Sequence, residues 1–126
     1  MFVSGRVPKN ASSITITVEA NDPEKVYKAL AAHLMSEGYS IEQSDKELGY
    51  INTERKKVKY AWEVRILTSI IGNKIKFTGK QFLPGFDKSE ETIRFFGAIG
   101  AMYKTCFNEV ERVAKLYPNT KVEYGM

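Results

Sequence analysis

The feature that most constrains the fold is a pair of alternating segments around Gly72 and Asn73. Before the turn, apolar side chains alternate with polar or small ones from residue 58 to residue 67, which is the pattern of a half-buried β-strand. Gly72-Asn73 is typical of a two-residue hairpin turn. Such a turn pairs Ile70 with Ile75 and Thr68 with Phe77, so the inward positions of both strands agree. The sequence therefore predicts an antiparallel hairpin with Trp62 facing the core.

A helix and further strands are predicted on both sides of this hairpin. Residues 13–19 alternate as a strand, and Asp22 followed by Pro23 predicts a helix that stops at Gly38. Residues 39–43 and 48–53 predict two short strands, the second with either Leu48 and Tyr50 or Gly49 and Ile51 facing inward. An apolar stripe ending at Pro118 predicts a long second helix. Residues 120–124 could add an edge strand or remain loose.

The predicted fold class is α+β. In the order β-α-β-β-β-β-α, we expect an antiparallel sheet of four to five strands with both helices packed on one face. The 126 residues suit one domain, over residues 13–126. Residues 1–12 are predicted to be a flexible lead-in, either a frayed terminus or a tether.

Positive charge is concentrated in and around the hairpin. Residues 54–80 contain eight basic and two acidic side chains, a net charge of +6, whereas the whole chain carries +4. Six of the basic residues are expected on the outer face of the sheet: Lys57, Lys59, Arg65, Lys74, Lys76 and Lys80. This face is either a solvated surface or a patch that binds a protein or an anionic membrane surface. Nucleic acid is not an expected partner, because the hairpin's aromatic residues face inward and the basic face is expected to lack them.

Small and apolar residues mark a second candidate site. Gly97 and Gly100 give the long helix a small-residue patch, and the loop before it contains Phe82, Leu83 and Phe86. Glycine inside a helix usually marks a close approach. The patch therefore indicates either tight packing onto the sheet or a cavity that carries a small apolar ligand, with the loop as its lip.

No catalytic or metal site is predicted, and no cofactor is expected. His33 is the only histidine and is expected to be exposed or flanking, while Cys106, the only cysteine, falls on the apolar side of the second helix. A nucleophile must be ionisable and reachable, so a Cys106–His33 dyad is not expected. The sequence predicts a domain that binds rather than an enzyme.

The order of elements, with the local text Glu37-Gly38-Tyr39-Ser40-Ile41 and Asp45-Lys46-Glu47-Leu48-Gly49-Tyr50-Ile51, resembles small bacterial envelope lipoprotein domains of the BamC-like type. The resemblance covers about residues 13–117. It implies a non-catalytic binding or scaffold domain of the cell envelope, periplasmic and lipid-anchored in the full-length protein. A cytoplasmic location stays open.

Overall fold

The computed structural model describes residues 2–4, 7, 11–19, 22–58, 62–82, 90–92 and 101–125. Their fold is α+β with antiparallel strands and two helices, as predicted. The helices are α1 (Pro23–Ser36) and α2 (Ala101–Leu116). The strands are β1 (Phe2–Ser4), β2 (Ser13–Thr17), β3 (Ile41–Asp45), β4 (Tyr50–Thr53), β5 (Lys56–Lys57), β6 (Glu63–Ile71), β7 (Lys74–Phe82), β8 (Glu90–Thr92) and β9 (Lys121–Gly125).

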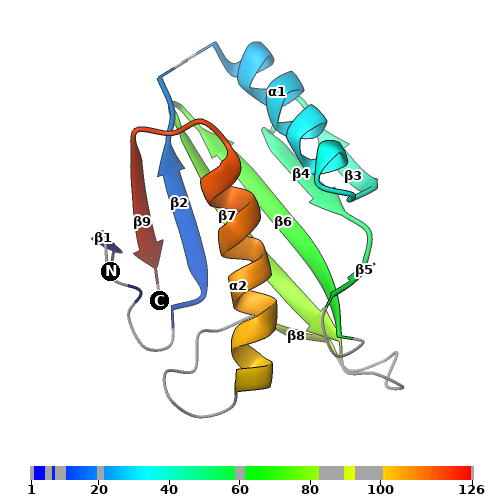
Figure 1. Ribbon diagram of the computed structural model, residues 1–126. Helices are drawn as coiled ribbons and strands as arrows, with labels where there is room; N and C mark the ends of the chain where they lie inside the picture. Colours follow the sequence, from blue (N-terminus) through cyan, green and yellow to red (C-terminus); the bar gives the residue numbers. More distant parts are fainter. Residues whose placement is uncertain are drawn as a thin grey trace.

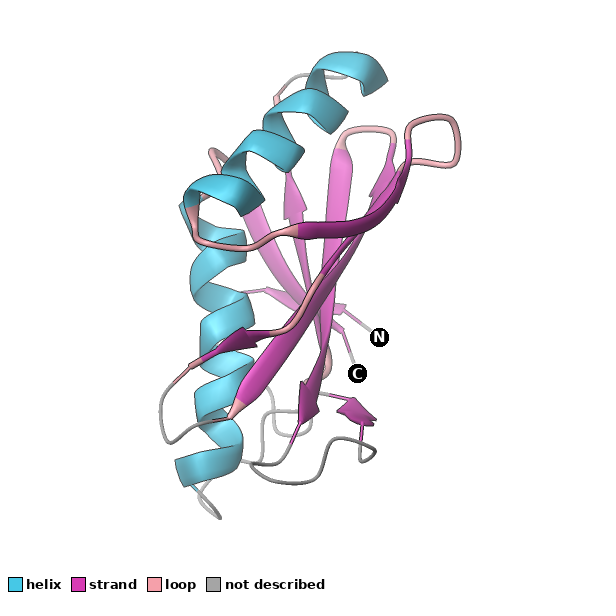
Figure 2. Cartoon of the chain, turned by 90° about the vertical axis from the view of Figure 1, so that its right-hand side faces the viewer, coloured by secondary structure: helices cyan, strands magenta, loops and turns pink. Residues whose placement is uncertain are grey.

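One sheet contains all of these strands, in the order β1-β9-β2-β7-β6-β4-β3, with β5 paired to β6 and β8 to β7. The additional short strands widen the four- to five-stranded sheet expected from the sequence. Figure 2 shows both helices on one face of the twisted sheet, while the other face carries no helix in the described part of the chain.

The central hairpin has the predicted register. Ile70 pairs with Ile75, Thr68 with Phe77 and Arg65 with Lys80, and the pairing continues to Glu63 and Phe82. Gly72 adopts a φ of 60°, the left-handed conformation that the tight turn requires. Trp62 is 1% exposed, which confirms its inward assignment.

The start of the hairpin differs from the sequence prediction. β6 begins at Glu63, and Lys56–Lys57 forms the separate strand β5, which pairs with Val64 and Glu63; residues 59–61 of the predicted strand lie outside the described residues. The N–H of Val58 donates to the carbonyl of Trp62 at 2.7 Å and continues this pairing. β5 thereby satisfies backbone groups that would otherwise be left at the edge of β6.

The β3–β4 hairpin settles the open question of which residues face inward. Ile51 is fully buried, so Tyr50 projects from the outer face beside Ser69. The expectation that the outer face lacks aromatic side chains is therefore wrong. The prediction failed because four alternating residues fit either face of the sheet. Which of them face inward depends on how the turn at Gly49, with a φ of 76°, leads into β4.

The two ends of the described chain join the same edge of the sheet. Residues 121–125, which the sequence left open, form β9 between β1 and β2. Within the predicted lead-in, Phe2–Ser4 pairs with β9, and Ala11 is buried. Figure 1 shows β9 running beside β2.

Both helices pack their apolar sides onto the sheet. Asp22 caps α1 by accepting a 3.1 Å hydrogen bond from the N–H of Glu24, and Gly38, at a φ of 91°, follows the helix end as predicted. α1 contacts β3, β4 and β6, and α2 contacts β2, β6 and β7. The core under the helices combines these buried side chains: Ile14, Ile16, Val26, Leu30, Leu34, Ile66, Ile75, Phe77, Phe107, Val110, Val113 and Ala114. The second helix is described from Ala101 onward, and Glu90–Thr92 before it forms β8 against β7 instead of a helix start.

Candidate binding site

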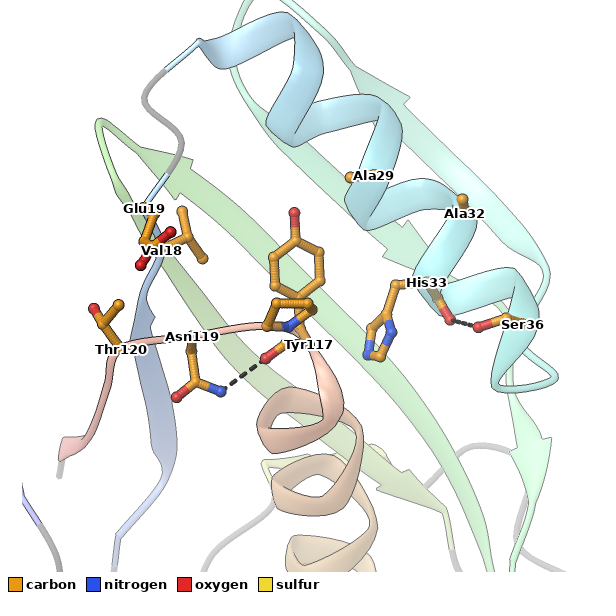
Figure 3. Close-up of a pocket in the computed structure, with 10 residues that line it drawn as sticks. Val18, Glu19, Ala29, Ala32, His33, Ser36, Tyr117, Asn119 and Thr120 are labelled. Carbon is orange, nitrogen blue, oxygen red and sulfur yellow. Dashed lines mark hydrogen bonds between the residues drawn. The ribbon is translucent and has the colours of Figure 1, made fainter.

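A cleft of about 730 Å³ lies where α1, the end of α2 and the connection to β9 meet (Figure 3). Its apolar lining consists of Val18, Ala29, Ala32, Pro118 and the ring of Tyr117. Its polar lining consists of Glu19, His33, Ser36, Asn119 and Thr120. The cleft is open to solvent along one side, because Ala29 and Ala32 are both exposed. Its volume lies within the range of small-molecule sites, about 300–1,000 Å³.

The cleft exists because α1 presents small side chains toward α2. Ala29, Ala32 and Ser36 recur at helical spacing on one face of α1, so this face fills little of the space between the helices. Large residues such as Leu30 and Leu34 point instead to the core. The small face of α1 is the local cause of the opening.

Tyr117 forms the opposite wall at the end of α2. The residue is only 7% exposed, and in Figure 3 its hydroxyl points up into the space between the end of β2 and α1. That hydroxyl makes no hydrogen bond to any residue that the structure describes. Burial raises the pKa of the phenol. The hydroxyl therefore stays protonated through the neutral range and can donate.

His33 joins the two helices beside this wall. Its Nε2 lies 2.6 Å from the carbonyl oxygen of Val113, and because a carbonyl can only accept, Nε2 carries the hydrogen. The imidazole meets the Tyr117 ring edge-on, with centroids 5.4 Å apart and planes at 90°. His33 is thus more engaged than the exposed or flanking residue expected. The sequence could not show this, because the acceptor is a backbone carbonyl 80 residues away.

Most of the remaining polar side chains of the cleft donate hydrogen bonds to backbone carbonyls. Asn119 Nδ2 donates to the carbonyls of Lys115 and Tyr117, at 3.2 and 2.7 Å. Ser36 Oγ donates to the His33 carbonyl at 2.7 Å. Glu19 is the only charged residue in the lining, and it forms no ion pair within the described part of the chain. The arrangement suits binding of an apolar body better than proton transfer.

The predicted basic face is partly neutralised. Lys59 lies outside the described residues. Arg65 makes a 2.8 Å ion pair with Glu42, and Lys74 lies 3.8 Å from Glu123. Lys80 lies opposite Arg65 in the hairpin register, so these two basic residues are neighbours of like charge. Lys57 and Lys76 are exposed and form no ion pair with a described acid. Free positive charge among the six predicted residues is therefore confined to separated positions.

A shallower groove of about 430 Å³ crosses the same outer face. Polar side chains dominate its lining, which comprises Gln43, Tyr50, Asn52, Leu67, Thr68, Ser69, Lys76 and Thr78. Tyr50, Ser69 and Lys76 lie in one row across β4, β6 and β7. The groove brings one free ammonium group and one aromatic ring to the open face.

The second predicted site is described only in part. Leu83, Phe86, Gly97 and Gly100 lie outside the described residues. Phe82 is 3% exposed, and the guanidinium of Arg55 lies 3.7 Å above the centre of its ring. Phe82 is therefore covered by a cation rather than open to a ligand.

Cys106 is fully buried, and burial raises its pKa to about 12. In the described ranges, no group of histidine, cysteine, aspartate and glutamate side chains could hold a metal ion. None of the described helices is long and apolar enough to cross a membrane. Comparison with known proteins adds no relative: no protein-family model matches the chain, and no curated protein has a similar sequence.

Proposed function

We propose that this chain is a non-catalytic binding domain that holds a small, mainly apolar molecule in the cleft between α1 and α2. The cleft itself carries the proposal, because its volume and its lining by alanine, valine and proline match small-molecule sites. The polar side chains around it bond mostly to backbone atoms, which favours binding over acid–base or nucleophilic chemistry. Cys106 is buried in the core and does not line the cleft.

The proposed site differs in place from the carrier site that the sequence suggested. That site was expected between the long helix and the sheet. Described residues there, including Phe107, Val110 and Ala114, are buried and fill the interface. The cleft lies beside the last turn of α2, against α1. A carrier function therefore finds its support between the helices.

An NMR titration with indane, a compact bicyclic hydrocarbon, tests the proposal. We expect saturable shifts at amides of Ala29, Ala32 and Asn119, and none on the outer face, for example at Thr78. Ala32→Trp should abolish the shifts, because the indole would occupy the cleft. Met35→Trp is the matched control, since Met35 is exposed on the same helix and does not line the cleft. Unsaturable shifts, or equal binding by both variants, would contradict the proposal.

A second candidate function is a binding or scaffold domain of the bacterial cell envelope, acting through the outer sheet face on a protein or an anionic membrane surface. Its supports are the exposed ammonium groups of Lys57 and Lys76, which form no ion pair with a described acid, and the likeness to BamC-like domains. Under this proposal the domain is periplasmic and lipid-anchored in the full-length protein. Nucleic acid is a less favoured partner, because the positive charge is partly paired.

Co-sedimentation with anionic vesicles tests this second function. Binding should fall steeply as salt rises from about 10 to 150 mM, since the Debye length shortens from about 30 to 8 Å. The double variant Lys57→Gln/Lys76→Gln should bind more weakly than Lys25→Gln/Lys28→Gln, which removes the same charge from exposed positions on α1. Equal loss in both variants would mean that net charge, and not this face, drives the association.

A further inference from the structure

The chemistry of the cleft indicates what kind of apolar molecule it accepts. Tyr117 is almost wholly buried, yet its hydroxyl points into the cleft and has no described partner. Because the cleft is open, the hydroxyl oxygen keeps contact with solvent, and a ligand acceptor can take the place of water there. A phenylalanine would provide the same ring without a donor. The hydroxyl is therefore the group of the cleft wall that can donate to a ligand atom.

The other polar hydrogens near the wall are already used. The Nε2–H of His33 donates to Val113, the Oγ–H of Ser36 to His33, and the Oγ–H of Thr120 to Thr17. Asn119 spends its amide hydrogens on two carbonyls of the α2 end. Among the hydroxyl groups that line the cleft, only that of Tyr117 donates to no described acceptor.

The charge of the lining residues further restricts the class of ligand that the cleft can bind. Glu19 is the only charged lining residue, so a carboxylate or phosphate on the ligand would meet a like charge and no cation. An anion would also lose its hydration among Val18, Ala29 and Ala32 without compensation. A neutral acceptor such as a ketone or ether oxygen avoids both costs and matches the phenol donor.

We propose that the cleft selects neutral, compact apolar molecules that carry one hydrogen-bond acceptor, and that Tyr117 recognises this acceptor through its hydroxyl. This inference rests on the proposed function of the cleft. His33 acts as a positioning residue, because its edge-on contact holds the phenol ring and its bond to Val113 fixes the imidazole.

Three rigid bicyclic probes test the selectivity: indane, 1-indanone and indane-1-carboxylate. They share one ring system and differ by a carbonyl or a charge. We expect 1-indanone to bind about 2- to 10-fold more tightly than indane, the increment of one neutral hydrogen bond. The carboxylate should bind more weakly than indane.

Tyr117→Phe assigns the effect to the hydroxyl. The variant keeps the ring that meets His33, so indane should bind as it does to the parent protein, and the preference for 1-indanone should disappear. Tyr50→Phe is the matched control, because it removes a hydroxyl from the outer face of the sheet and should leave the preference unchanged. If Tyr117→Phe fails to fold, the Tyr117 ¹³Cζ shift of the parent protein serves instead, since only 1-indanone should move it through the oxygen.

The outcomes distinguish failure of acceptor recognition by Tyr117 from failure of small-molecule binding in the cleft. Equal affinities of the parent protein for indane and 1-indanone, or a preference that survives in Tyr117→Phe, would overturn the recognition by Tyr117 and leave the cleft as a site. Failure of all three probes to bind would overturn the proposed function as well. Tightest binding by the carboxylate would overturn the selection of neutral molecules.

Discussion

The phenolic hydroxyl of Tyr39 donates a 2.7 Å hydrogen bond to the carboxylate of Glu109, joining the segment after α1 to the middle of α2. Arg112 donates to both oxygens of the same carboxylate, at 3.1 and 3.0 Å, and reaches Glu37 at 2.6 Å. The ammonium of Lys56 lies 3.8 Å from Glu109 and 4.7 Å from the centre of the Tyr39 ring. This network holds the end of α1 to α2.

Glu109→Gln should weaken the network and lower the free energy of unfolding by about 1–3 kcal/mol, because Tyr39 and Arg112 would lose a charged acceptor. Urea unfolding at neutral pH measures the change. Glu24→Gln is the control: Glu24 pairs with Lys28 and Lys46 on the exposed surface, where such ion pairs add little, so its loss should not be measurable. A Glu109→Gln variant as stable as Glu24→Gln would show that the network contributes nothing to the free energy of unfolding.

The same carboxylate gives the stability a pH dependence. Burial raises the pKa of Glu109, but hydrogen bonds from Arg112 and Tyr39, with the charges of Arg112 and Lys56, outweigh it and hold the pKa below its ordinary value. The folded state therefore binds its proton less readily than the unfolded state. The stabilisation is complete above the ordinary pKa, about 4.3, and is lost as pH falls through the lower folded value. Parent and Glu109→Gln stabilities should converge in acid; a constant difference from neutral to strongly acidic pH would disprove the linkage.

Gly49→Ala should destabilise the protein more than Gly72→Ala, although both glycines have positive φ. At Gly72 an added Cβ meets nothing within 4 Å, so only backbone strain of about 1 kcal/mol is expected. At Gly49 the Cβ would lie 2.9 Å from the Ile70 carbonyl oxygen, and the total cost should reach about 2–3 kcal/mol. Thermal unfolding of the two variants measures the order, and the reverse order would mean that the β4 turn relaxes freely.

The thiol of Cys106 should be unreactive in the folded protein. The residue is fully buried, and burial raises its pKa to about 12, so almost no thiolate forms at pH 8. Reaction with an aromatic disulfide reagent should be slow and should accelerate as urea unfolds the chain. Fast, stoichiometric reaction under native conditions would reopen the question of a nucleophilic cysteine.

Iodide should not quench the native fluorescence of Trp62, the only tryptophan. The side chain is 1% exposed next to β6, so the anion cannot reach the indole without unfolding. Free tryptophan amide under the same salt is the control. Strong native quenching would contradict the inward face of the central hairpin.

The sequence could predict the elements whose geometry is local. Gly72-Asn73 fixed a turn whose length sets the register of every pair in the hairpin, and Asp22 with Gly38 marked the limits of α1. The cleft could not be predicted in this way. Its walls come from Ala32 and Tyr117, which meet only because the two helices pack on the same face. His33 gave no signal, since its partner is a backbone carbonyl that any residue at position 113 would supply.

The position of β9 between β1 and β2 determines the order in which the strands of the sheet can pair. β1 pairs only with β9, and β9 in turn bonds to β2, among the described strands. β1 must therefore wait unpaired until β9, more than 100 residues further along the chain, has emerged from the ribosome. Bringing two such distant segments together lowers the conformational entropy of the chain before their contacts form, and this slows folding. We expect the β2–β7–β6–β4–β3 part of the sheet to assemble first, with the β1–β9 edge completed only after β9 has emerged.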